Sequence, residues 1–124
     1  MAREFLGDEW PDQHYHYGSE SVYKHWTGWV FYTEGVRHMA TDLGAFWLID
    51  LIASHQKPIG KMPKLAGFQL WILKCDPDEV ATASCHADID EPAEVSQQIE
   101  YTDFPYRQQK LYLVDRVLML PTEY

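Results

Sequence analysis

Long hydrophobic runs are missing from this sequence, and so is the pattern of a secretory signal peptide. No apolar run approaches the ~18 residues that a membrane-spanning helix needs. Residues 1–11 carry acidic side chains where a signal peptide has a positive start followed by an apolar stretch. We therefore expect a cytoplasmic protein that has no membrane partner.

Cysteine is scarce as well, since Cys75 and Cys85 are the only two in the chain. Two cysteines are too few for a disulfide framework. A turn that pairs Cys75 with Val80 would put Cys85 opposite Leu70, five residue steps away from Cys75. At about 3.3 Å per residue, this exceeds the Cα separation that a disulfide allows. We expect two free and buried thiols.

Recognisable chemical motifs are also absent. The sequence holds no phosphate-binding glycine loop, nucleophile elbow, Cys-x-x-Cys pair or zinc-protease helix. His14 and His16 would share one face of an extended segment, as two ligands of a metal site do, but no third ligand is identifiable nearby. We expect no metal and no cofactor, and the sequence by itself names no activity.

Basic residues are missing from one long stretch. The chain has 19 acidic and 10 basic residues and a net charge of −9, and residues 75–106 carry nine acids but no Lys or Arg. An acidic surface repels nucleic-acid phosphates, which disfavours direct nucleic-acid binding. The acidic stretch either attracts a basic protein partner or keeps the chain soluble.

What the chain has in abundance is aromatic surface. Five Trp, eight Tyr and five Phe among 124 residues are more than one small core can hide. Because interfaces are enriched in Tyr and Trp, we expect some of these rings at a surface groove, a protein contact or a homo-oligomer interface. The alternative is that the rings cover an edge of the sheet.

Two helices are predicted in the N-terminal half. Thr33 is a suitable N-cap for a helix that begins at Glu34, and Gly44 is suited to end it in a left-handed conformation. The second helix, residues 45–55, is apolar almost all the way round, apart from a strip formed by Asp50 and Ser54. Such a helix is expected to be buried.

A proline- and glycine-rich loop over residues 57–67 separates the helices from a half that is typical of β-sheet. One face of residues 80–87 carries only small side chains, which suggests that a helix packs closely against it. The alternation in residues 95–101 suits an edge strand. The predicted strands are residues 29–32, 68–75, 80–87, 95–101, 110–114 and 117–120.

These elements predict an α+β fold in a single domain, residues 1–124, in which residues 1–21 form a surface arm. We expect the two helices to pack on one face of a mostly antiparallel sheet of four to six strands. At 124 residues the chain is long enough to bury roughly two thirds of its unfolded surface.

Four residues on or near the buried helix are the candidate site residues. Asp50 and His55 are the candidates for catalysis, and Tyr32 and Ser54 are the candidates for binding. An acid in a buried helix must either face a solvent-filled cleft or be tied to a partner. For the second case we expect Arg37, His38 or a backbone amide as that partner.

Several segments resemble an uncharacterised family of small proteins from bacterial chromosomes, plasmids and phages. They are Tyr-Thr-Glu-Gly-Val from Tyr32, residues 45–56, Thr-Asp-Phe-Pro-Tyr from Thr102 and Leu-Pro-Thr-Glu-Tyr from Leu120. The usual tyrosine before Trp47 is Phe46 here, so any role of that hydroxyl is absent. The resemblance implies no activity, because the function of the family is unknown, but it suggests an origin in a mobile element.

The sequence therefore supports two hypotheses about function. The first is a non-enzymatic binding or accessory protein that acts through an aromatic-rich, acidic surface. The alternative is a small enzyme with a pocket beside helix 45–55 that uses Asp50 and His55.

Overall fold

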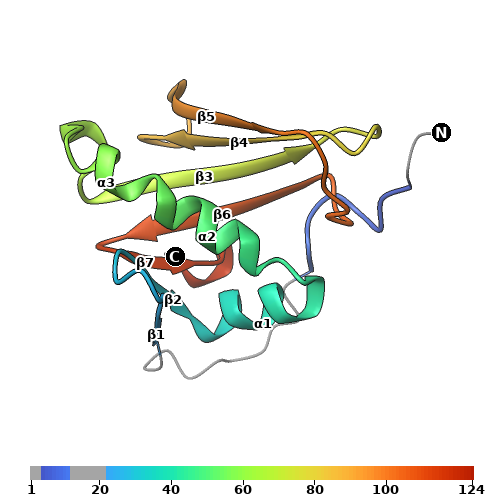
Figure 1. Ribbon diagram of the computed structural model, residues 1–124, viewed down its shortest axis with the longest axis horizontal. Helices are drawn as coiled ribbons and strands as arrows, with labels where there is room; N and C mark the ends of the chain where they lie inside the picture. Colours follow the sequence, from blue (N-terminus) through green and yellow to red (C-terminus); the bar gives the residue numbers. More distant parts are fainter. Residues whose placement is uncertain (1–3, 12–21) are drawn as a thin grey trace.

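The computed structural model describes residues 4–11 and 22–124 (Figure 1). His14 and His16 lie outside the described residues. In chain order the elements are β1 (Val22–Lys24), β2 (Phe31–Thr33), α1 (Glu34–Leu43), α2 (Phe46–Ser54), α3 (Gln56–Ile59), β3 (Phe68–Cys75), β4 (Ala81–His86), β5 (Ala93–Ile99), β6 (Gln108–Val114) and β7 (Val117–Met119), with short 3₁₀ turns at Pro63–Leu65 and Pro121–Glu123.

Among the described residues, seven strands form one sheet in the order β1-β2-β7-β6-β3-β4-β5. Neighbouring strands are antiparallel except β2 and β7, which run parallel. The predicted α+β class and mostly antiparallel sheet are confirmed, but the prediction of four to six strands was too low. The additional strand is β1, which pairs with β2 because Gly28, at a φ of 80°, lets the chain reverse between them.

Helix α1 begins and ends as its sequence predicts. The Thr33 side chain accepts a hydrogen bond from the Val36 N–H, and Gly44 follows the helix in the left-handed conformation at φ 61° and ψ 38°. Helix α2 ends at Ser54. The predicted loop of residues 57–67 contains part of α3, because Pro58 lies in the first turn of that helix, where no backbone N–H is needed.

Helix α2 and the central strands contribute to one hydrophobic core. Ile49 and Ile52 are completely buried in it, together with Ala81 and Cys85 of β4. Figure 1 shows α2 lying across the sheet in front of β3 and β6. Strand β5, at the end of the strand order, is the half-exposed edge strand that the sequence predicts.

Both cysteines are free and buried, as predicted, although the register around them differs by one residue. Cys75 pairs with Ala81, and Cys85 lies opposite Trp71 rather than Leu70. The turn is one residue longer than predicted because Glu79 adopts a positive φ of 71° and the Asp76 N–H donates to the Val80 carbonyl.

The N-terminal residues 4–11 are fastened to the chain before β6. Backbone hydrogen bonds join Leu6 to Pro105, Gly7 to Arg107 and Asp8 to Gln108. The Trp10 side chain is buried in the hydrophobic core, and its indole N–H donates to Asp42 of α1 at 2.9 Å. This segment therefore joins one end of the sheet to α1.

The C-terminal turn closes onto the start of α1. The Glu123 carboxylate accepts hydrogen bonds from the Thr33 hydroxyl at 2.7 Å and from the Leu120 N–H at 2.8 Å. It lies so close to Gly35 that a Cβ at that position would be 2.8 Å from both carboxylate oxygens. A negative charge at this end of a helix is favourable, because the helix dipole is positive there.

We expect Gly35→Ala to lower the free energy of unfolding by about 1–2 kcal/mol, although Gly→Ala in a helix ordinarily raises it by about 1 kcal/mol. The sign reverses because the added methyl group displaces Glu123 from its two donors. Urea unfolding followed by circular dichroism measures the change.

The control is the same substitution made in a Glu123→Ala background. With the carboxylate removed, Gly35→Ala should be neutral or stabilising, so the two substitutions should be strongly non-additive. Equal destabilisation in both backgrounds would contradict the close contact between Gly35 and Glu123.

Burial of the Cys85 thiol should make the free energy of unfolding depend on pH. Burial, with a smaller effect from the charge of Glu94, raises the pKa of Cys85 to about 12, against an ordinary value of 9.0. Between pH 9 and pH 12 the unfolded thiol therefore ionises while the native thiol does not, so this group lowers stability as the pH rises through that window.

In a Cys75→Ala background, native Cys85 should therefore resist iodoacetamide at pH 9 and react after denaturation, as followed by mass spectrometry. The stability advantage of Cys85 over a further Cys85→Ala substitution should also shrink between pH 9 and pH 12. Native labelling at the denatured rate would contradict the prediction.

Candidate functional site

The loop between β1 and β2 presents two tryptophans next to the exposed strip of α2. Trp26 is 82% exposed and Trp29 is 46% exposed. On α2, Phe46 and Asp50 lie one helical turn apart and are both exposed. We call Trp26, Trp29, Phe46 and Asp50 the Trp26 surface.

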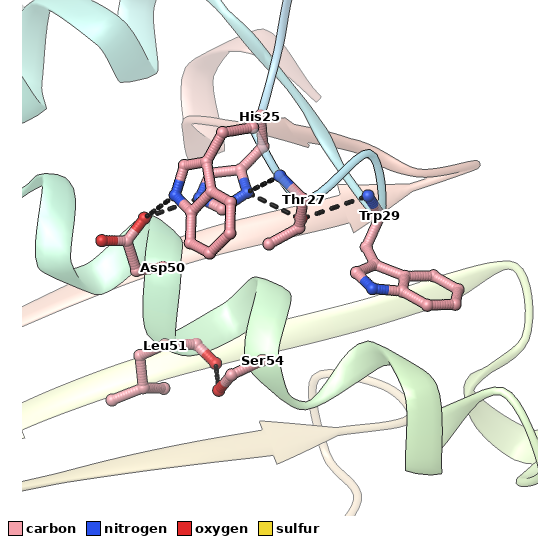
Figure 2. Close-up of polar contacts among 7 residues, drawn as sticks. His25, Thr27, Trp29, Asp50, Leu51 and Ser54 are labelled. Atoms are coloured by element: carbon pink, nitrogen blue, oxygen red, sulfur yellow. Dashed lines mark hydrogen bonds and ion pairs between the residues drawn. The ribbon is translucent and has the colours of Figure 1, made fainter.

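Asp50 ties α2 to this loop (Figure 2). Its Oδ1 lies 2.6 Å from His25 Nε2 and accepts a hydrogen bond from the Trp26 indole N–H at 3.2 Å. The Asp50 side chain is 53% exposed, whereas the His25 side chain is only 5% exposed. One carboxylate therefore holds both a buried imidazole and an exposed indole.

The hydrogen bonds around His25 assign its tautomer. The Thr27 backbone N–H donates to Nδ1 at 3.2 Å, so Nδ1 is an acceptor and Nε2 carries the proton that is donated to Asp50. The Thr27 hydroxyl, 2.7 Å from Nδ1, then donates to that nitrogen and accepts from the Trp29 N–H at 3.3 Å. The network fixes the conformation of the loop.

A chain of carboxylate, imidazole and hydroxyl is also the composition of a hydrolytic site. In this loop, however, the imidazole is buried and the Thr27 hydroxyl is already held by His25 and by the Trp29 N–H. The arrangement instead holds the Trp26 indole through Asp50 and the Trp29 backbone N–H through Thr27, and Figure 2 shows Trp29 at the far end of the loop. We therefore interpret these groups as a support for the exposed rings.

Further aromatic contacts extend from the Trp26 surface toward α1. The Tyr32 ring meets Phe46 edge to face at 6.4 Å and stacks on Tyr23 at 5.7 Å. The Arg37 guanidinium lies 4.7 Å from the centre of the Tyr23 ring. The Tyr23 hydroxyl donates to Glu34, and this hydrogen bond, together with burial and the charge of Glu34, raises the pKa of Tyr23.

The four predicted site residues have different surroundings. Tyr32 lies among the aromatic rings described above, but Ser54 donates to the carbonyl of Leu51 on its own helix at 2.6 Å (Figure 2). His55 Nε2 lies 2.7 Å from the side-chain oxygen of Gln97 on β5. Among the described residues, no hydrogen bond joins Asp50 to His55 or to Ser54.

The predicted partners of Asp50 were wrong. Its partners are His25 and Trp26 rather than Arg37, His38 or a backbone amide. Sequence reasoning missed His25 because its proximity to Asp50 depends on how the β1–β2 loop meets α2, 25 residues further along the chain. The available signal was Gly28, a glycine inside the β-branched and aromatic run of residues 22–32, which closes the loop that carries His25 and Trp26.

A second surface feature lies along α1. It is a groove lined by Glu34, Arg37, His38, Thr41 and Asp42. Charges of both signs line it, and several already have partners: Arg37 lies 3.6 Å from Glu34, and Asp42 accepts from Trp10. Three of its five lining side chains, Glu34, Arg37 and Asp42, are therefore already engaged within the protein.

Within residues 4–11 and 22–124, no group of three or more His, Cys, Asp or Glu side chains is placed to hold a metal ion. The same described ranges contain no helix that is long and apolar enough to cross a membrane.

Comparison with known proteins identifies the family. The sequence model of a family of unknown function, DUF6876, matches residues 12–124 of this chain. The chain belongs to the DUF6876 family. The resemblance inferred from the sequence motifs is thereby confirmed, and the function of the family is unknown. No curated protein and no solved structure matches the chain.

The contacts of Asp50 predict its effect on stability. We expect Asp50→Ala to lower the free energy of unfolding by about 1–3 kcal/mol, because the buried His25 Nε2–H loses its acceptor. Asp50→Asn should lose less, since its amide oxygen can accept the same hydrogen bond. Urea unfolding measures both.

Ser54→Ala is the matched control, because Ser54 lies one turn further along α2 and bonds only within the helix. It should change stability by less than about 0.5 kcal/mol. If Asp50→Ala were as stable as wild type, the contact between Asp50 and His25 would not hold the loop.

Proposed function

We propose that this protein is a non-enzymatic, cytoplasmic binding protein whose contact surface is the Trp26 surface and whose partner is a protein with a basic contact region. The observation that carries the proposal is Trp26 itself. Its ring is 82% exposed and is nevertheless held in place by a hydrogen bond to Asp50.

An exposed tryptophan leaves a large apolar area in water, which a partner can bury with a favourable free energy. Because Asp50 already orients the ring, the Trp26 side chain would lose little conformational entropy on binding. Tryptophan is also the side chain most enriched among the residues that dominate interface energies. Trp29 of the same loop and Phe46, one turn before Asp50 on α2, are further exposed rings of this region.

The charge of the chain supports a basic partner. The net charge of −9 would attract basic proteins and repel nucleic acids over a distance. Two bases lie near the loop. Lys24 has its side chain beside Gly28, and Arg116 donates to the carbonyls of Gly28 at 2.5 Å and Trp29 at 3.3 Å and so supports the loop. Asp50 remains half exposed beside the indole.

The cytoplasmic location is supported by the two cysteines. Both are buried free thiols, and a reducing compartment preserves them in that form. A second copy of this chain is the alternative partner for the Trp26 surface. Sedimentation distinguishes such self-association from binding of a different protein.

The test is capture of partners from a host lysate with three immobilised proteins: wild type, Trp26→Ala and Tyr101→Ala. Tyr101 is 69% exposed and follows the edge strand β5, so its substitution is the matched control. We expect wild type and Tyr101→Ala to capture the same partner protein. The amount captured by Trp26→Ala should be at least about 10-fold lower, and salt should release the partner from wild type.

The proposal fails if no salt-sensitive partner is captured, or if Trp26→Ala captures it as well as wild type. Sedimentation of purified protein tests the alternative partner. A dimer that dissociates in Trp26→Ala would overturn the proposal in favour of self-association.

A further inference from the structure

Strand β5 leaves one edge of the sheet open. It is the last strand in the order and pairs only with β4 among the described strands (Figure 1). In an antiparallel edge strand, alternate residues point their N–H and C=O groups away from the neighbouring strand. These outward groups are a template on which another extended chain can form hydrogen bonds.

Natural edge strands are usually protected by proline, lysine or a bulge. Here the protection is confined to the beginning of β5, where Pro92 precedes the strand and the register shifts opposite Cys85 and His86. From Val95 to Ile99 the strand, Val-Ser-Gln-Gln-Ile, contains no proline and no charge. These five residues form the open part of the edge.

Acidic residues bound the open part at both ends. Glu94 precedes it and Glu100 follows it. Lys64 lies 3.4 Å from Glu94, but the lysine side chain is 73% exposed, and such surface pairs contribute little. Residues 75–106 contain no Lys or Arg, so no base of this stretch offsets the two acids.

This pattern of charge discriminates between occupants. If a second copy paired antiparallel with β5 about Gln97, the Glu94 of each copy would come close to the Glu100 of the other. Like charges facing each other across two strands are destabilising. An extended segment with a basic residue on each side of an uncharged core has the opposite and favourable arrangement.

We propose that β5 accepts an extended segment of a partner protein as an additional antiparallel strand. The segment carries a Lys or Arg at each end of a five-residue uncharged core, and these bases face Glu94 and Glu100. Backbone hydrogen bonds along Val95–Ile99 supply affinity, and the two carboxylates select the charge. The site is distinct from the Trp26 surface, because the β1–β2 loop and β5 belong to opposite ends of the strand order.

The probe is a capped peptide, Lys-Thr-Val-Thr-Val-Thr-Lys, titrated into the full chain and followed by amide NMR. We expect saturable shifts confined to Val95–Ile99 and their neighbours on β4. A peptide with Glu at both ends should bind at least about 10-fold more weakly. On the protein side, Glu100→Gln should weaken binding more than Asp115→Asn, which removes the same charge at the distant β6–β7 turn.

Two N-methylated peptides separate strand pairing from general attraction between opposite charges. Methylation of alternate residues blocks either the N–H groups that face β5 or those that face solvent. One pattern should abolish binding and the other should preserve it. Equal binding of the two methylated peptides, or shifts that map away from residues 94–100 and β4, would overturn the proposal.

Sedimentation of the protein alone provides the last test. A dimer whose formation broadens the Val95–Ile99 amides would make a second copy the occupant and would overturn the proposal, whereas a monomer that binds the peptide supports it.

Discussion

Burial of one side of α2 in the hydrophobic core is the constraint on which the rest of the structure depends. Ile49 and Ile52 are fully buried and belong to the same core as Ala81, Ala83 and Cys85 of β4. A larger residue in this core would force its neighbours apart, since protein interiors leave little unfilled volume. Because the inner side of α2 is held there, its polar strip faces outward and brings Asp50 to the surface beneath the β1–β2 loop.

Two of the segments on which the sequence resemblance rests meet in the fold. Thr33 caps α1, Gly35 makes room for a carboxylate, and that carboxylate belongs to Glu123 in the C-terminal turn. Segments about 90 residues apart in the sequence therefore form one structural unit. This unit fastens the C-terminal turn to the start of α1.

The two contact sites that we propose differ in kind. The Trp26 surface offers rigid aromatic area, in which the buried imidazole of His25 holds Asp50 and Asp50 in turn holds the indole. Strand β5 offers backbone hydrogen-bonding groups flanked by carboxylates. We propose a protein partner for each site, and the excess of acidic residues is the argument for basic ones.

The sequence by itself determined what depends on neighbours within a few residues. The cap at Thr33, the left-handed Gly44, the small face of β4 and the free thiols were predictable, because capping and strand alternation are local rules. Only the tertiary structure decided the strand β1, the one-residue shift at Cys85 and the pairing of Asp50 with His25. Those features depend on how distant segments meet, and a one-residue change in a turn or the path of one loop alters such contacts while leaving every local pattern unchanged.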